Sequence, residues 1–171
     1  LKFVRHYGER AGNLYNRPDV EVVQSEGRNF ISRTQKKFDI IYLGFVDSWA
    51  SVASGGLSLS ENYLYTTEAF RDYYDHLTDN GMLVILRWDV DVPRLVSNSV
   101  ALLGAGEAAE RVAVMVERRD ANPDGSDPPQ MLFMLKKTPF NETQRQEMMT
   151  TWMPLARPWI VPAAVTTAPF G

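Results

Sequence analysis

Two apolar runs with a helical pattern between them constrain the fold of this chain most strongly. Residues 38–43 and 82–86 are apolar apart from Asp39, as in strands that are buried on both faces of a parallel sheet. From residue 67 to residue 77, apolar side chains recur at spacings of three and four, and Thr66 stands in the N-cap position. A strand, a helix and a second strand in this order predict an α/β domain with a mostly parallel sheet.

Further elements are expected on both sides of this unit. Helices are predicted over 1–15, 28–34, 93–103 and 141–151, and strands over 20–23, 111–117 and 131–136. The last two strands should form an antiparallel hairpin, because a loop rich in proline and aspartate joins them. The sheet would then contain the strands that begin near residues 38, 82, 111 and 131, with the 20–23 strand attached at an edge.

The chain divides near residue 140. Asn141 with Gln144 three residues later has the pattern of a capping box, which predicts the start of the final helix. Prolines recur beyond this helix and break regular structure. We therefore expect one domain over 1–140, followed by a helix and an irregular, proline-rich tail over 141–171.

Composition restricts the class of protein and the kinds of site. The formal net charge is −3 with both signs interspersed, which argues against nucleic acid as a partner. No cysteine is present and His6 and His76 lie far apart, so no metal site is predicted. No apolar run approaches the roughly 18 residues of a membrane span, and no signal-peptide pattern is present. We expect a cytoplasmic protein and, because Leu1 stands inside an expected helix, a piece of a longer one.

The stretch from 44 to 65 is the first place to look for a site. It contains three glycines and five serines and has little regular period. Loops of this length inside a compact domain are uncommon unless they are functional or disordered.

Three sequence pieces together carry a resemblance to a known family. They are residues 17–23 leading to 26–28, residues 38–41 with 46–49, and residues 59–66 followed by a helix and 79–81. In order and spacing they resemble the spermidine synthase-like proteins, which have the class I S-adenosylmethionine-dependent methyltransferase fold. The similarity runs from about residue 15 to 88, more weakly to 140, and is greatest to divergent bacterial members that are often attached to membrane-spanning segments.

The resemblance implies a Rossmann-like, methyltransferase-type sheet that lacks its first two strands. The family's first strand, its glycine-rich turn and the acidic end of its second strand have no counterpart here. Residues 1–140 would then be a partial transferase domain. In this fold the two absent strands lie between the third and fourth strands, so the 20–23 strand would have lost its neighbours.

On the cofactor side, the resemblance implies that Glu26 and Gly27 bind the nucleotide. The acidic residue after the third strand lies near the adenine amino group, and a carboxylate can accept a hydrogen bond from an amine. A glycine there would let the backbone approach the ring. The alternative is a solvated glutamate in a strand-ending turn.

On the acceptor side, the resemblance places the family's catalytic aspartate at Gly44 and its second acidic residue at Asp47. Asp47 is therefore the candidate catalytic residue, and the absence of the first carboxylate argues against polyamine synthesis. Glu61, Tyr63 and Tyr65 fall where the family lines its acceptor pocket. The alternative is that both tyrosines only anchor the loop onto the following helix.

These implications lead to two hypotheses about function. In the first, the chain is part of an aminopropyl- or methyl-transferase-like enzyme that uses S-adenosylmethionine or its decarboxylated form, with a small-molecule acceptor, and is incomplete alone. In the second, it is a non-catalytic module of a larger protein, in which case it could be the cytoplasmic domain of a membrane protein. The remainder of a longer chain or a homodimer partner would cover the open sheet edge.

Overall fold

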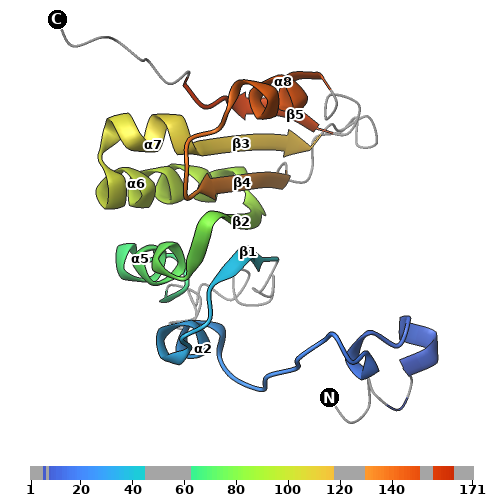
Figure 1. Cartoon of the computed structure of the whole chain (residues 1–171). Helices are drawn as coiled ribbons and strands as arrows, with labels where there is room; N and C mark the ends of the chain where they lie inside the picture. The colour runs from blue at the N-terminus through green and yellow to red at the C-terminus, as the bar shows by residue number, and fades with distance from the viewer. Residues whose placement is uncertain (1–5, 7, 45–62, 118–129, 151–155, 164–171) are drawn as a thin grey trace, which may run out of the picture.

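The computed structural model describes residues 6, 8–44, 63–117, 130–150 and 156–163. Its centre is a five-stranded sheet in the order β1-β2-β4-β3-β5 (Figure 1). The strands are β1 (Phe38–Leu43), β2 (Leu77–Trp88), β3 (Val112–Glu117), β4 (Gln130–Lys136) and β5 (Ala156–Ile160). The α-helices are α2 (Gly27–Arg33), α5 (Thr67–Asp75), α6 (Val92–Leu103), α7 (Ala105–Arg111) and α8 (Glu142–Thr150). Three short 3-10 helices are η1 (Gly8–Ala11), η2 (Leu14–Asn16) and η3 (Asp89–Asp91).

Strand direction confirms the expected α/β class. β1 and β2 are parallel, whereas β4 is antiparallel to both of its neighbours, β2 and β3. β1, β2 and β3 therefore run in one direction, and β4 and β5 run in the other. The predicted β3–β4 hairpin is present, with β4 inserted between β2 and β3.

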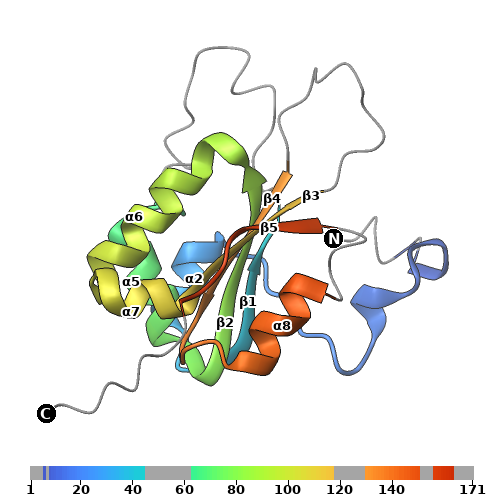
Figure 2. The same cartoon turned by 90° about the horizontal axis from the view of Figure 1, so that it is seen from above.

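Helices cover the two faces of the sheet unequally. Figure 2 shows α2, α5, α6 and α7 on one side and α8 alone on the other. On the first side Phe70 of α5 and Phe133 of β4 are fully buried, with ring centroids 6.1 Å apart. A smaller cluster around Met134 and Met148 lies under α8. None of the helices in the described ranges has the length and apolar character needed to cross a lipid bilayer.

The outer strand β1 departs from its predicted burial. Ile41 is buried, but Ile40 and Tyr42 on the opposite face are 62% and 57% exposed. The expectation of burial on both faces is thus wrong for β1, because no other described strand pairs with its outer edge and no described helix covers these two side chains. The same expectation is confirmed for the middle of β2, where Leu83 and Ile85 on one face are fully buried and Val84 on the other face is 9% exposed.

The predicted helix starts are confirmed in atomic detail. The Thr66 hydroxyl accepts a hydrogen bond from the Ala69 backbone N–H at 3.2 Å, which caps α5. At α8, the Asn141 side chain accepts from the Gln144 N–H at 2.9 Å, and the Gln144 side chain accepts from the Asn141 N–H at 3.1 Å. This reciprocal pair is the capping box.

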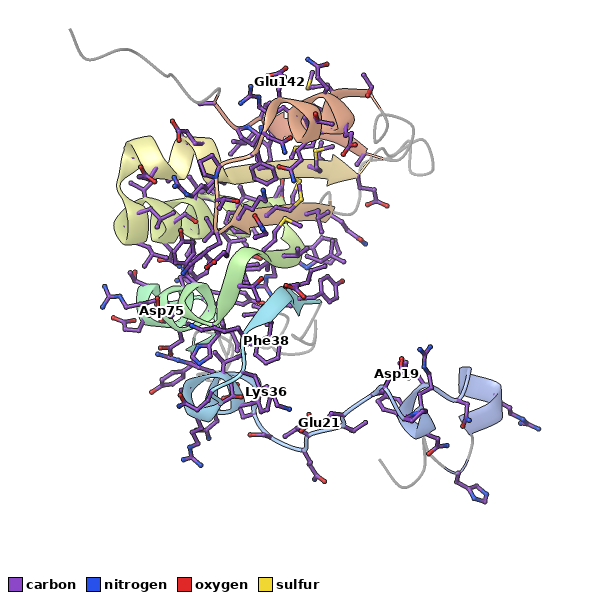
Figure 3. The ribbon with its side chains drawn as sticks, viewed as in Figure 1. Asp19, Glu21, Lys36, Phe38, Asp75 and Glu142 are labelled. Carbon is purple, nitrogen blue, oxygen red and sulfur yellow. The ribbon has the colours of Figure 1, made fainter. Side chains whose placement is uncertain are left out.

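The amino-terminal predictions need correction. Residues 20–23 form no strand, so the expected attachment at a sheet edge is wrong; Figure 3 shows this segment leading from Asp19, well away from the sheet, toward Lys36. Lys36 forms an ion pair with Glu21. Upstream, η1 and η2 replace a continuous helix in the described part of 1–15, because Gly12 and Asn13 adopt left-handed φ angles of 66° and 54°.

The carboxy-terminal part also differs from expectation. The strand β5 pairs with β3 although irregular chain was expected after residue 154. Pro158 is accommodated because β5 is an edge strand, where a missing N–H leaves no partner unpaired. α7 was not predicted, since Gly104 ends α6 with a φ of 82° and a second helix starts at once.

Candidate functional site

The candidate site lies where the parallel strands β1 and β2 end. Leu43 pairs with Ile85, so Gly44 and Arg87 stand at the same edge of the sheet. In open α/β sheets, ligands bind outside the carboxyl ends of the strands. The residues around this edge are therefore the first to consider.

Arg87 links this edge to one of the predicted tyrosines. Its guanidinium carbon lies 4.7 Å from the ring centroid of Tyr65, within the range of a cation–π contact. Its Nε donates to a carboxylate oxygen of Asp91 at 2.9 Å. The Arg87 side chain is only 13% exposed. The buried Tyr65 thus stands beside a cation held in place by a carboxylate.

Asn98 holds the backbone of the same segment. This α6 residue is 9% exposed, and its side-chain Nδ2 donates to the Tyr65 carbonyl at 2.8 Å. Its Oδ1 accepts from the Thr67 hydroxyl at 3.2 Å. Buried amides need such partners, so the pair of bonds fixes both α6 and the segment that precedes α5.

Tyr73 adds a second anchor. Its hydroxyl donates to the Leu64 carbonyl at 3.2 Å, between the two predicted tyrosines. Burial raises the pKa of Tyr73 well above its usual range, so the phenol remains a hydroxyl and keeps donating. Three hydrogen bonds, at Leu64, Tyr65 and Thr67, therefore fix this segment to side chains of α5 and α6.

Arg28 connects Tyr63 to the predicted nucleotide side. Its Nη1 donates to the Tyr63 carbonyl at 3.1 Å, and its guanidinium lies 5.5 Å from the centroid of the Tyr63 ring. Its Nε is 3.8 Å from Asp72 of α5. Arg28, the residue after Glu26 and Gly27, thus links the start of α2 to Tyr63, which is 60% exposed.

Glu26 has a structural role at the start of α2. One carboxylate oxygen accepts from the Arg28 N–H at 3.1 Å, and the other accepts from the Asn29 N–H at 2.9 Å. It is therefore the N-cap of the helix, and the residue itself is exposed. A carboxylate has about four lone-pair sites, so two remain for a ligand amine.

Gly27 borders open space. Apart from its chain neighbours and the backbone of its own helix, no atom lies within 4 Å of the position that a Cβ would take there. A hollow of about 360 Å³ lies beside this glycine. It is lined by Glu21, Val23, Ser25, Gly27, Phe30, Lys36 and Phe38. Phe30 and Phe38 form aromatic walls of this hollow, and Glu26 is next to it in the chain.

Gly44 directly follows β1, at the position where the resemblance places a catalytic aspartate. A Cβ at this position would lie 3.3 Å from a ring carbon of Tyr42 and 3.4 Å from its hydroxyl oxygen. The phenol therefore lies over the glycine. Asp47 and Glu61 lie outside the described residues, and their roles remain predictions.

Sequence reasoning missed Arg28 and Asn98. Asn98 had a visible signal, because it is a polar residue on the apolar stripe that Leu95 and Leu102 define in α6. Arg28 had none, since its contact with Tyr63 spans 35 residues of sequence.

Comparisons with known proteins show what this chain is similar to. No protein-family model matches the sequence. The polyamine aminopropyltransferase of Thermococcus onnurineus is 30% identical over 84 residues, which make up 49% of this chain and 27% of that protein.

Solved structures give the same result for the fold. Spermidine synthase from Thermotoga maritima superposes with a TM-score of 0.55 at 16% identity, over 87% of this chain and 46% of that chain. A spermidine synthase in complex with the transition state analogue AdoDATO has a TM-score of 0.55 at 16% identity, covering 87% and 47%. A probable spermidine synthase from Corynebacterium glutamicum has a TM-score of 0.51 at 20% identity, covering 82% and 48%. The chain is similar to a polyamine aminopropyltransferase over 84 residues, shares the fold of the solved spermidine synthases, and spans less than half the length of these proteins.

Proposed function

We propose that this spermidine synthase-like chain supplies the acceptor side and the adenine-side wall of a nucleotide-dependent transferase. The observation that carries the proposal is the Arg28–Tyr63 contact, which joins the start of α2 to the segment before α5. Two regions that the resemblance assigns to nucleotide and acceptor, more than 30 residues apart in sequence, meet there.

In this proposal each side chain has a limited task. Glu26 accepts a hydrogen bond from the adenine amine, and Gly27 leaves room for the ring. Tyr63 and Tyr65 line the acceptor pocket, with Glu61 as a further polar group. Asp47 holds or deprotonates the acceptor. S-adenosylmethionine or its decarboxylated form, when bound, supplies a carbon activated by the adjacent sulfonium.

We further infer that the site is incomplete in this chain alone. The outer edge of β1 is open in the described part of the structure, next to Ile40 and Tyr42. The fold of the solved spermidine synthases extends over roughly as much chain again. We propose that the glycine-rich half of the cradle belongs to other residues, of the same longer cytoplasmic protein or of a partner.

Titration of the isolated chain with S-adenosylmethionine and with its thioether product tests this proposal. We expect weak binding, with dissociation constants near or above about 1 mM, or −4 kcal/mol. In an amide NMR titration the perturbed residues should be Gly27, Arg28 and Tyr63, whereas the α8 amides serve as the control. Micromolar affinity would contradict the incomplete site, and perturbations confined to other surfaces would contradict the assigned residues.

The second candidate is a non-catalytic module that contributes to assembly or regulation. Gly44 favours it, because a glycine cannot hold or deprotonate an acceptor. The coding region upstream of Leu1 distinguishes the two. A strand followed by a glycine-rich turn supports the transferase, and a reading frame that starts here supports the module.

A further inference from the structure

We propose that Tyr42 is a specificity-determining residue of this site, and that its phenol takes the place of the carboxylate that spermidine synthase-like proteins use for an amine. The acceptor would then carry an oxygen nucleophile, a hydroxyl or a carboxylate, rather than an ammonium group. This inference rests on the proposed function, because it assumes that the end of β1 faces the acceptor.

At the end of β1, the Tyr42 side chain lies against Gly44. Tyr42 and Gly44 are two residues apart in an extended segment, so their side-chain positions share one face of the sheet. The Tyr42 ring and hydroxyl lie 3.3–3.6 Å from the place where a Gly44 Cβ would be. An aspartate side chain at 44 would start in contact with the phenol. Tyr42 is 57% exposed, so the group remains within reach of a ligand.

A phenol and a carboxylate differ in charge and in hydrogen bonding. A carboxylate only accepts hydrogen bonds and holds a full negative charge, which suits an ammonium. A phenol both donates and accepts, and therefore suits a hydroxyl or a carboxylate oxygen. Exchanging the first group for the second removes the charge that an amine acceptor needs.

The neighbouring cations favour the same class of acceptor. Arg28 stands over the ring of Tyr63, and Arg87 stands over the ring of Tyr65. Each guanidinium also has a carboxylate partner, Asp72 for Arg28 and Asp91 for Arg87. Their N–H groups are hydrogen-bond donors, which a carboxylate or hydroxyl oxygen can accept and an ammonium cannot.

A double-mutant cycle tests the placement without any ligand. We expect Gly44→Asp to lower the urea midpoint of the full chain, because Tyr42 must move away. In a Tyr42→Ala background the same substitution should have little effect. Gly27→Asp is the matched control, since space there is open, and its effect should be equal in both backgrounds. Equal effects of Gly44→Asp in both backgrounds would show that the phenol does not occupy this position.

Three four-carbon probes test the selectivity by amide NMR of the same chain: putrescine, butane-1,4-diol and succinate. We expect the wild-type amides of Leu43, Gly44 and Tyr65 to respond to the diol or to succinate and not to putrescine. The Tyr42→Ala/Gly44→Asp variant should reverse this order. A wild-type response to putrescine alone, or a variant with unchanged selectivity, would overturn the inference. If S-adenosylmethionine and its thioether product perturb only other surfaces, that result would contradict the roles of Glu26 and Gly27 and the proposed transferase, and not the selectivity assigned to Tyr42.

Discussion

The side-chain amide of Asn98 donates a hydrogen bond to the backbone carbonyl of Tyr65 at 2.8 Å, and so ties helix α6 to the segment that carries both predicted acceptor tyrosines. The same amide accepts from the Thr67 hydroxyl. Because the group is 9% exposed, water cannot readily replace either partner. The position of this segment therefore depends on one side chain from the next helix.

Replacing Asn98 with leucine should destabilise the chain. The substitution keeps the volume but leaves the Tyr65 carbonyl and the Thr67 hydroxyl without their partner, which costs about 1–3 kcal/mol. Urea unfolding followed by circular dichroism measures the change. Ser97→Ala, on the exposed side of the same helix, should change the free energy of unfolding by less than about 0.5 kcal/mol. Equal effects of the two substitutions would rule out the anchoring role of Asn98.

The capping box of α8 should have a measurable effect of its own. Asn141→Ala removes the acceptor for the Gln144 N–H and should cost about 1 kcal/mol. Asn141→Ser retains a side-chain acceptor and should recover most of the loss. Thermal or urea unfolding of the three proteins gives the comparison. If alanine and serine are equally destabilising, the observed bonds do not stabilise the helix.

Stability should also depend on pH through Glu68 in the first turn of α5. Hydrogen bonds from its own backbone N–H and from the Thr66 hydroxyl lower the pKa of Glu68 below the ordinary value of 4.5. A lowered pKa in the folded state stabilises the fold above the unfolded value, and this contribution is lost as pH falls through the folded pKa. Glu68→Gln should therefore reduce the urea midpoint at pH 7. The difference from the wild type should shrink as pH falls below 4.5 and vanish once pH is below the folded pKa of Glu68, and a constant difference would contradict this assignment.

The sequence predicted most of the sheet because β1 to β4 and their helices follow local rules. Thr66 and Asn141 mark helix starts, and alternating strands and helices determine the α/β class. β5 could not be predicted, since Pro158 is compatible with a strand only at an edge. Which strand lies at an edge is a property of the assembled sheet.

Burial of β1 was mispredicted for a related reason. Ile40 and Tyr42 have the composition of a strand covered on both faces, but their exposure depends on which elements pack against that face, and the residues of the strand do not encode this. In the candidate site, the resemblance supplied Glu26 and Tyr63, but only the fold brings them together through Arg28. Long-range contacts of this kind leave no periodic signal in a sequence.

The exposed edge and face of β1 lead to a prediction about self-association. An unpaired strand edge flanked by apolar side chains is a template for pairing with another chain, so we expect the isolated protein to form dimers at micromolar concentration.

Ile40 is 62% exposed, and Ile40→Lys places a charge on this surface in both copies. Burial of one isoleucine contributes about 1.5–3 kcal/mol, so losing it twice should weaken association at least about 100-fold. Sedimentation velocity over a concentration series measures the change, with Val90→Lys, 77% exposed in η3, as the matched control. A monomeric wild type, or dimers that Ile40→Lys and Val90→Lys weaken equally, would show that β1 does not form the contact.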